Sequence, residues 1–139
     1  MFKRILLGFD GSDHAQRAAK VAAGIARQEK DAQMWVVVVV EPIPTELGKP
    51  YFSELILMRT NAGDELVELA KQIIGDGITV HEELLFATPA ESIIEVADTQ
   101  NCDLIVMGTR GLGGLRSLLL GSQIHKVISL AKCPVLAVK

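Results

Sequence analysis

The sequence predicts an α/β protein, an open parallel sheet of five strands with helices on both faces. Apolar runs of strand length alternate along the chain with stripes of apolar residues at helical spacing. The chain is 49% apolar, 22% charged and only 4% aromatic, a composition typical of aliphatic helices packed on a sheet. Its length of 139 residues corresponds to one domain, covering residues 1–139.

Five short apolar runs are predicted to be strands. The run Met34–Val40 is almost wholly apolar and rich in valine, as expected of a strand that is covered on both faces. The run Ile78–Phe86 partly alternates between polar and apolar residues, which fits an edge strand. The other predicted strands are Ile5–Phe9, Leu104–Met107 and Pro134–Val138.

Four amphipathic helices are predicted between these strands, because apolar residues recur there at steps of three and four. Ser12 is expected to cap the first helix, and Gly75 is expected to end the second. The run from Thr88 through Pro89 to Glu91 has the pattern of a helix start. The apolar stripes span residues 15–26, 55–73, 90–97 and 124–131.

Charge and composition exclude several classes of protein. The formal net charge of −3 excludes the broad basic surface of a nucleic-acid binder. Cys102 and Cys133 are too few for a disulfide framework, and buried thiols in a reducing cytosol are expected. The N-terminus lacks a signal-peptide pattern, and no apolar run approaches the roughly 20 residues of a membrane helix. We therefore expect a soluble cytoplasmic protein.

Ligands of open α/β sheets bind at the carboxyl ends of the strands, so the residues that follow each strand are the candidates. The segment Gly108–Gly121 contains five glycines in fourteen residues, and glycine lets backbone N–H groups approach a ligand closely. Ser122 is expected to cap the fourth helix, whose free N–H groups would favour a phosphate. Arg110 and Arg116 would add positive charge. The alternative is that these glycines only allow the chain to turn. Five glycines in fourteen residues favour phosphate binding over this alternative.

Two common nucleotide motifs do not fit the chain. No Lys-Ser/Thr pair follows the last glycine of this segment, so it is not a Walker A loop. The dinucleotide fingerprint would follow the first strand, where the chain has only GFDGS. A conventional dehydrogenase or P-loop ATPase is therefore disfavoured.

The spacing Gly108-x2-Gly111-x9-Gly121-Ser122 resembles the nucleotide-binding motif of the universal stress protein family. The resemblance covers the whole chain, because ILLGFDGS, IVMGTRG and KCPVLAV look like the family's first, fourth and fifth strands. It implies the strand order 3-2-1-4-5, with a switch point between strands 1 and 4. Asp10 would then face Gly108 across the crevice.

The resemblance also implies membership of the ATP-binding subgroup and a set of binding residues. Gly8, Phe9 and Asp10 would line the ribose, and Asp10 could reach a Mg²⁺ ion shared with the phosphates. The backbone of Val39, or of an adjacent residue, would hold adenine. Val38 departs from the family, many of whose members have His there. Met107 and Gly108 would close over the nucleoside, and the phosphates would be held by Arg110, Gly111, Gly121, Ser122 and Gln123.

The leading hypothesis is a cytoplasmic ATP-binding stress-response protein that acts as a nucleotide-dependent switch or sensor, with AMP or ADP as alternative ligands. A slow ATP hydrolase or a nucleotidyl transferase is the second hypothesis, although no catalytic base is evident. A pure interaction module with an empty pocket is the third. His14, His81 and His125 lack the spacing of metal ligands. A homodimer through the terminal strand Pro134–Val138 is expected, because pairing would satisfy its open edge.

Overall fold

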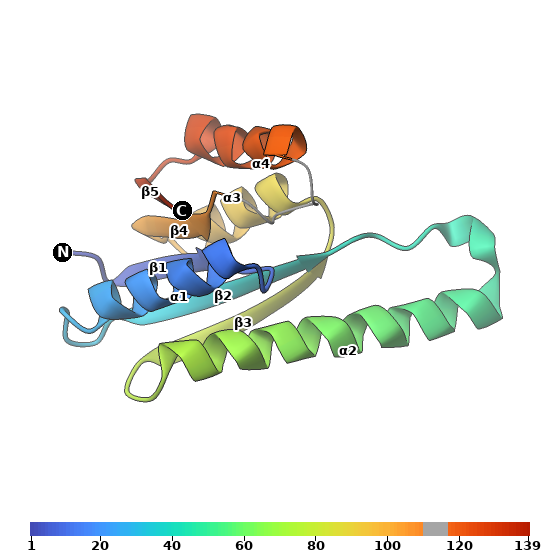
Figure 1. Cartoon of the computed structure of the whole chain (residues 1–139), viewed down its shortest axis with the longest axis horizontal. Coiled ribbons are helices and arrows are strands. Elements are labelled where there is room, and N and C mark those ends of the chain that lie inside the picture. The colour runs from blue at the N-terminus through green and yellow to red at the C-terminus, as the bar shows by residue number, and fades with distance from the viewer. Residues whose placement is uncertain (110–116) are drawn as a thin grey trace.

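The computed structural model describes residues 1–109 and 117–139. Strands and helices alternate along them, as Figure 1 shows, and the five strands form a parallel sheet of order β3-β2-β1-β4-β5. Both the predicted fold class and the strand order are therefore confirmed. The strands are β1 (Arg4–Gly8), β2 (Gln33–Val40), β3 (Thr79–Phe86), β4 (Leu104–Gly108) and β5 (Val135–Val138). The helices are α1 (Asp13–Ala26), α2 (Lys49–Ile74), α3 (Pro89–Thr99) and α4 (Ser117–Leu130), with a 3₁₀ turn at Thr45–Leu47.

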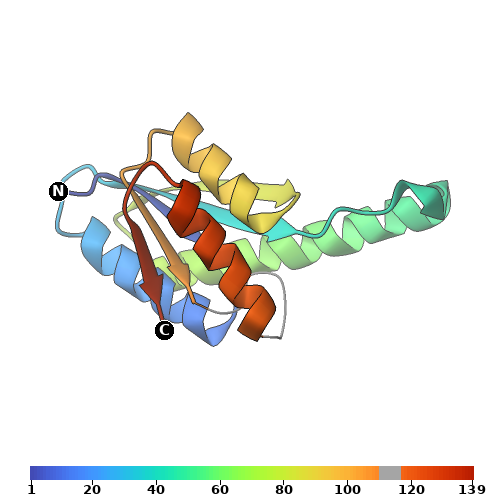
Figure 2. The same cartoon turned by 90° about the horizontal axis from the view of Figure 1, so that it is seen from above.

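The sheet separates two apolar layers (Figures 1 and 2). Helices α1 and α2 cover one face, where alternate strand residues such as Leu7 and Val36 meet the alanines of α1. Helices α3 and α4 cover the other face, where Leu6 and Trp35 meet Ile93. Because the strands are parallel and covered on both sides, β1 and β4 are almost wholly buried. The outermost strand β3 is half exposed, which confirms its predicted edge position.

Helix α2 is much longer than the others, and its first half projects beyond the sheet (Figures 1 and 2). It begins beside Gly48 with Pro50 in its first turn, where the missing proline N–H costs nothing. The three prolines of residues 41–51 (Pro42, Pro44 and Pro50) therefore all lie outside the helix interior, although Lys49–Tyr51 join the first turn. The helix ends at Gly75, whose φ of 78° suits glycine, so this predicted end is confirmed.

The predicted start of the last helix is wrong. Helix α4 begins at Ser117, so Gly121 and Ser122 lie inside it and Ser122 is not its cap. The reason is local propensity: three leucines, which are good helix formers, precede Gly121, and a single interior glycine costs a helix only about 1 kcal/mol. Interior N–H groups bond to carbonyls one turn earlier. In this conformation the backbone N–H groups of Gly121 and Ser122 are already used by the helix.

Candidate functional site at the carboxyl edge of the sheet

The strand order reverses between β1 and β4, and the turn after β1 lies at this point. The Asp10 carboxylate accepts a hydrogen bond from the Ser12 N–H (3.0 Å), and Gly11 supplies the left-handed φ of 81° that the turn requires. The Ser12 hydroxyl then accepts from the Ala15 N–H (3.2 Å), which confirms it as the cap of α1. The turn holds Asp10 at the switch point, and Oδ2 of Asp10 has no hydrogen-bond partner among the described residues.

Helix α1 lies so close to the end of β4 that Gly108 has no room for a side chain. A Cβ at Gly108 would lie 2.8 Å from the His14 Cβ and 2.9 Å from the Ala15 backbone nitrogen. A Cβ at Gly8 would lie 3.0 Å from Cδ1 of Ile93. Packing against the backbone of α1 therefore explains the glycine at position 108, whereas at position 8 a small shift of the Ile93 side chain would make room for a Cβ. The glycine at position 108 does not by itself indicate a ligand.

The backbone of Val39 is the clearest available group at this edge. In a parallel strand, alternate residues direct both their N–H and C=O groups to the same neighbouring strand. Residue Val37 faces β1, because its carbonyl accepts the Phe9 N–H (3.0 Å), whereas the Val40 carbonyl accepts from Ala87 on the β3 side. Val39 therefore faces the β1 side, but the pairing of β1 with β2 ends at Val37. Its N–H and C=O point into the gap that β1 leaves.

The other predicted nucleoside contacts can come only from backbone atoms. The side chains of Phe9 and Met107 are 1% and 0% exposed and lie in opposite core layers. Val38, the position at which the chain departs from the family pattern, is also completely buried. A change from His to Val at this position therefore affects packing inside the sheet and does not alter the surface of the crevice.

The predicted phosphate residues fall into two groups. Arg110 and Gly111 lie outside the described residues, as does Arg116. Gln123 is described: its side-chain Oε1 accepts a hydrogen bond from the Ala90 N–H (3.2 Å) in the first turn of α3. This residue thus caps α3 from α4. The phosphate contacts at Gly121, Ser122 and Gln123 stay predictions.

A salt bridge reinforces the contact between α3 and α4. The Lys126 ammonium pairs with the Glu91 carboxylate, which lies one residue beyond Ala90. Hydrogen bonds from Lys126 and from the Thr88 hydroxyl lower the pKa of Glu91 from 4.5 to about 2. The predicted start of α3 is confirmed at Pro89, but the Thr88 side chain makes no capping hydrogen bond to the helix backbone.

Sequence reasoning missed one polar pair at the switch point. The ring nitrogen Nδ1 of His14, in α1, lies 2.8 Å from the hydroxyl of Thr109, the residue that directly follows β4. The Thr109 N–H also donates to the Val138 carbonyl (2.8 Å). His14 and Thr109 are far apart in the sequence, so only the strand order could have placed them together.

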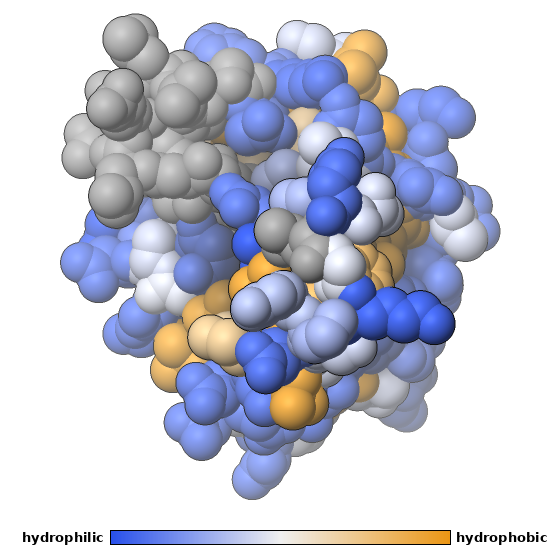
Figure 3. All heavy atoms as spheres, turned by 90° about the vertical axis from the view of Figure 1, so that its right-hand side faces the viewer, coloured by the Kyte–Doolittle hydropathy of each residue, from blue (hydrophilic) through white to orange (hydrophobic). Residues whose placement is uncertain are grey.

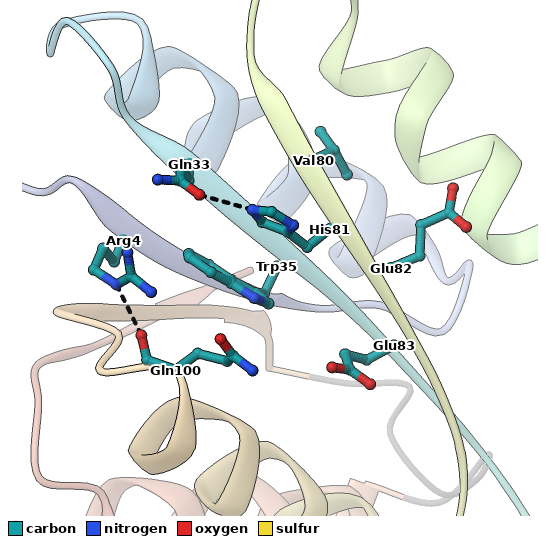
Figure 4. A pocket seen from close by; sticks show the side chains of 8 residues that line it. All are labelled: Arg4, Gln33, Trp35, Val80, His81, Glu82, Glu83 and Gln100. Carbon is teal, nitrogen blue, oxygen red and sulfur yellow. Dashed lines mark hydrogen bonds between the residues drawn. The ribbon is translucent and has the colours of Figure 1, made fainter.

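A hollow of about 690 Å³ lies near the amino ends of β1 and β2, away from the predicted site (Figure 4). Trp35 is the centre of its wall: the Arg4 guanidinium lies 4.6 Å from the Trp35 ring centroid, and His81 stacks on the ring at the same distance. Arg4 Nε donates to the Gln100 carbonyl (2.8 Å), and His81 Nε2 lies 2.7 Å from Gln33 Oε1. The His81 contacts thus join the edge strand β3 to β2, and the Arg4 bond joins β1 to the end of α3.

The two thiols lie between α3 and β5, in the same core layer. Cys102 is buried, and desolvation, followed by proximity to Cys133, raises its pKa to about 12. Cys133 is only half buried, so the prediction of a buried thiol holds fully for Cys102 alone.

Among residues 1–109 and 117–139, no helix has the length and apolar character that crossing a membrane requires.

The strand order defines a doubly wound α/β protein, a class in which ligands bind at the carboxyl edge of the sheet where the strand order reverses. The family model for universal stress proteins matches residues 1–139, and the chain belongs to this family. Its sequence is 46% identical to a universal stress protein of Thermus aquaticus and 30% identical to YxiE of Bacillus subtilis, with complete coverage of all three chains.

Solved structures show the same fold. The universal stress protein UspA from Lactobacillus plantarum superposes with a TM-score of 0.84 at 25% identity, over 99% of this chain and 98% of that one. A universal stress protein in complex with cAMP superposes with a TM-score of 0.71 at 27% identity, over 99% of this chain and 97% of the other.

Proposed function

We propose that this chain is an ATP-binding stress-response protein that acts as a nucleotide-dependent switch. The observation that carries the proposal is the backbone edge of Val39, which has no partner among the described residues and continues the register of β2 to the level of Asp10. Adenine presents a donor and an acceptor on one edge, and the N–H and C=O of a single strand residue match that pattern. The solved relative that holds cAMP supports an adenine nucleotide as the ligand.

In this proposal the adenine lies against Val39, and the ribose lies beside Gly8 and Phe9. Met107 and Gly108 contribute backbone surface from the other side. The phosphates point toward the glycine-rich segment, where Arg110, Gly111, Gly121, Ser122 and Gln123 are the proposed contacts.

A Mg²⁺ ion fits beside Asp10, since magnesium prefers carboxylate oxygen and one oxygen of this carboxylate lacks a described partner. The ion would screen the phosphate charge. Hydrolysis is the second candidate, because no catalytic base is evident in the sequence.

We further propose a cytoplasmic homodimer. Strand β5 forms an open edge of the sheet, and its N–H and C=O groups on that side could pair with a second copy across a two-fold axis. The two free thiols agree with a reducing compartment.

Calorimetric titration with ATP and Mg²⁺, and in parallel with AMP and cAMP, tests the nucleotide site. Asp10→Ala should weaken ATP binding about tenfold, because it removes a charged hydrogen-bonding group. Asp13→Ala is the matched control: it removes the same charge from the exposed first turn of α1 and should leave the affinity unchanged. Absence of any adenine nucleotide binding at millimolar ligand would disprove the proposed function.

A further inference from the structure

The first half of α2 forms an arm, residues 49–62, that extends beyond the sheet (Figures 1 and 2). The buried residues of α2 all lie in its second half: Gly63, Val67, Ala70 and Ile74. Several of the exposed large apolar side chains of the described chain gather on the arm instead. Figure 3, which views the molecule from this side, shows apolar surface bordered by hydrophilic side chains.

The inner face of the arm is already occupied by the chain itself. Phe52 and Ile56 line an apolar hollow of about 280 Å³ together with Phe86 and the segment after β2. Arg59 Nη1 donates to the carbonyls of Glu41 (2.7 Å) and Pro42 (3.1 Å). These contacts hold the arm against the segment after β2, so its outer face is presented in a defined orientation.

The outer face has a continuous apolar stripe at Tyr51, Leu55, Met58 and Ala62, which recur at steps of four, three and four. Tyr51 and Met58 are each 66% exposed. The same stripe continues in the second half of α2 through Leu66 and Leu69, which pack partly buried against the core layer that contains α1. One stripe is therefore covered by α1 over half of its length and left open over the other half.

We propose that this open stripe binds a second copy of the chain, with the two arms antiparallel across a two-fold axis. Steps of four and three are the spacing of a two-helix seam. In the symmetric register, Leu55 lies opposite the partner's Met58, and Tyr51 lies opposite the partner's Ala62. Each layer thus combines side chains of complementary size, and the largest side chain meets the smallest.

The charges beside the stripe agree with self-pairing. In the antiparallel register Glu54 borders the partner's Asn61, and Arg59 borders the partner's Phe52, so no two like charges face each other. The stripe spans about 18 Å of helix. A surface this short buries less than the roughly 800 Å² per partner of a standard interface, so the pairing is weak and depends on concentration.

Analytical ultracentrifugation tests this surface in an Ala137→Pro background, which blocks pairing through β5. From about 10 µM to about 1 mM, the background protein should pass from monomer toward dimer. Met58→Glu should raise the dissociation constant at least about tenfold, because it places a charge inside the seam. Leu57→Glu is the matched control: Leu57 is 62% exposed but lies off the stripe, so its variant should associate like the background.

Crosslinking gives an independent readout in the chain with an unaltered β5. The double variant Leu55→Cys, Met58→Cys should form a disulfide-linked dimer on mild oxidation, whereas Leu57→Cys should not. A monomeric background at 1 mM without crosslinks, or equal effects of Met58→Glu and Leu57→Glu, would overturn the proposal. The ATP affinity of Met58→Glu should equal that of the parent, which separates this surface from the nucleotide site.

Discussion

Gly108 and Asp10 lie at the same switch point, but the structure gives them different physical roles. Gly108 is fixed by close packing, because the start of α1 occupies the space of a side chain. Asp10 is fixed by a hydrogen bond within its own turn, and its other carboxylate oxygen has no hydrogen-bond partner among the described residues. Substitution at Gly108 should therefore change stability first, whereas substitution at Asp10 should change ligand affinity first.

We predict that Gly108→Ala destabilises the fold by about 1–3 kcal/mol, because the new Cβ would push against the backbone of α1 and cannot be relieved by a rotamer change. Urea unfolding measures this change. Gly24→Ala is the opposite case: it lies inside α1 with nothing within 4 Å of its Cβ, and it should stabilise the protein by about 0.5–1 kcal/mol. Equal stability of the two variants would contradict the proposed packing at Gly108.

The pH dependence of Glu91 follows from its lowered pKa. Its folded-state pKa is about 2, against an ordinary value of 4.5, so its stabilising contribution is complete above pH 4.5 and is lost as the pH falls toward 2. Lys126→Met should return the pKa toward its ordinary value and flatten this part of the stability curve. NMR titration of the carboxyl groups measures the pKa of Glu91 in each variant. Lys132→Met is the control, because it removes the ion-pair partner of Asp98 and should leave the pKa of Glu91 unchanged.

At the scale of elements, the backbone hydrogen bonds of β5 show which of its residues face β4 and which face the open edge of the sheet. The Thr109 and Ile105 N–H groups donate to Val138 and Pro134, so these residues face β4. Because alternate residues face opposite ways, Val135 and Ala137 direct their backbone groups toward the open edge. Ala137 is also exposed, so a substitution there reaches the edge without disturbing the core.

Ala137→Pro should therefore abolish a β5-mediated dimer while preserving the fold, since it removes one outward N–H and no bond to β4. Light scattering at low micromolar concentration should show a dimer for the parent and a monomer for the variant, with similar circular dichroism. Ala137→Thr retains the N–H and should remain dimeric. A parent that is already monomeric, or an Ala137→Pro dimer, would refute pairing through β5.

At the scale of the whole molecule, patterns in the sequence predict the elements better than they predict the contacts between them. Three predictions that depend only on nearby residues are confirmed: the valine-rich strand β2, the half-polar edge strand β3 and the Ser12 cap of α1. The start of α4 was predicted at Ser122, but the leucines before Gly121 extend the helix back to Ser117. The contacts of His14 with Thr109 and of Gln123 with Ala90 join distant segments, so they require the strand order, which came from family resemblance.

The proposed site joins groups from three separate stretches of chain at one edge, so protection beyond the global stabilisation should be confined to that edge. Saturating ATP should slow hydrogen exchange at the amides of Val39, of residues 10–12 and of Gly108. Saturation at about one hundred times Kd should also raise global stability by roughly 2.7 kcal/mol.

The hollow around Trp35 is the internal control for this experiment. Its wall is held together by protein partners near the other end of the strands, so amides near Arg4 and Gln33 should show only the global stabilisation. Local protection greater than this at the Trp35 hollow, with none at Val39, would move the nucleotide to the opposite end of the sheet. That result would contradict the backbone edge of Val39 as the adenine site and would leave its unpaired groups without a ligand.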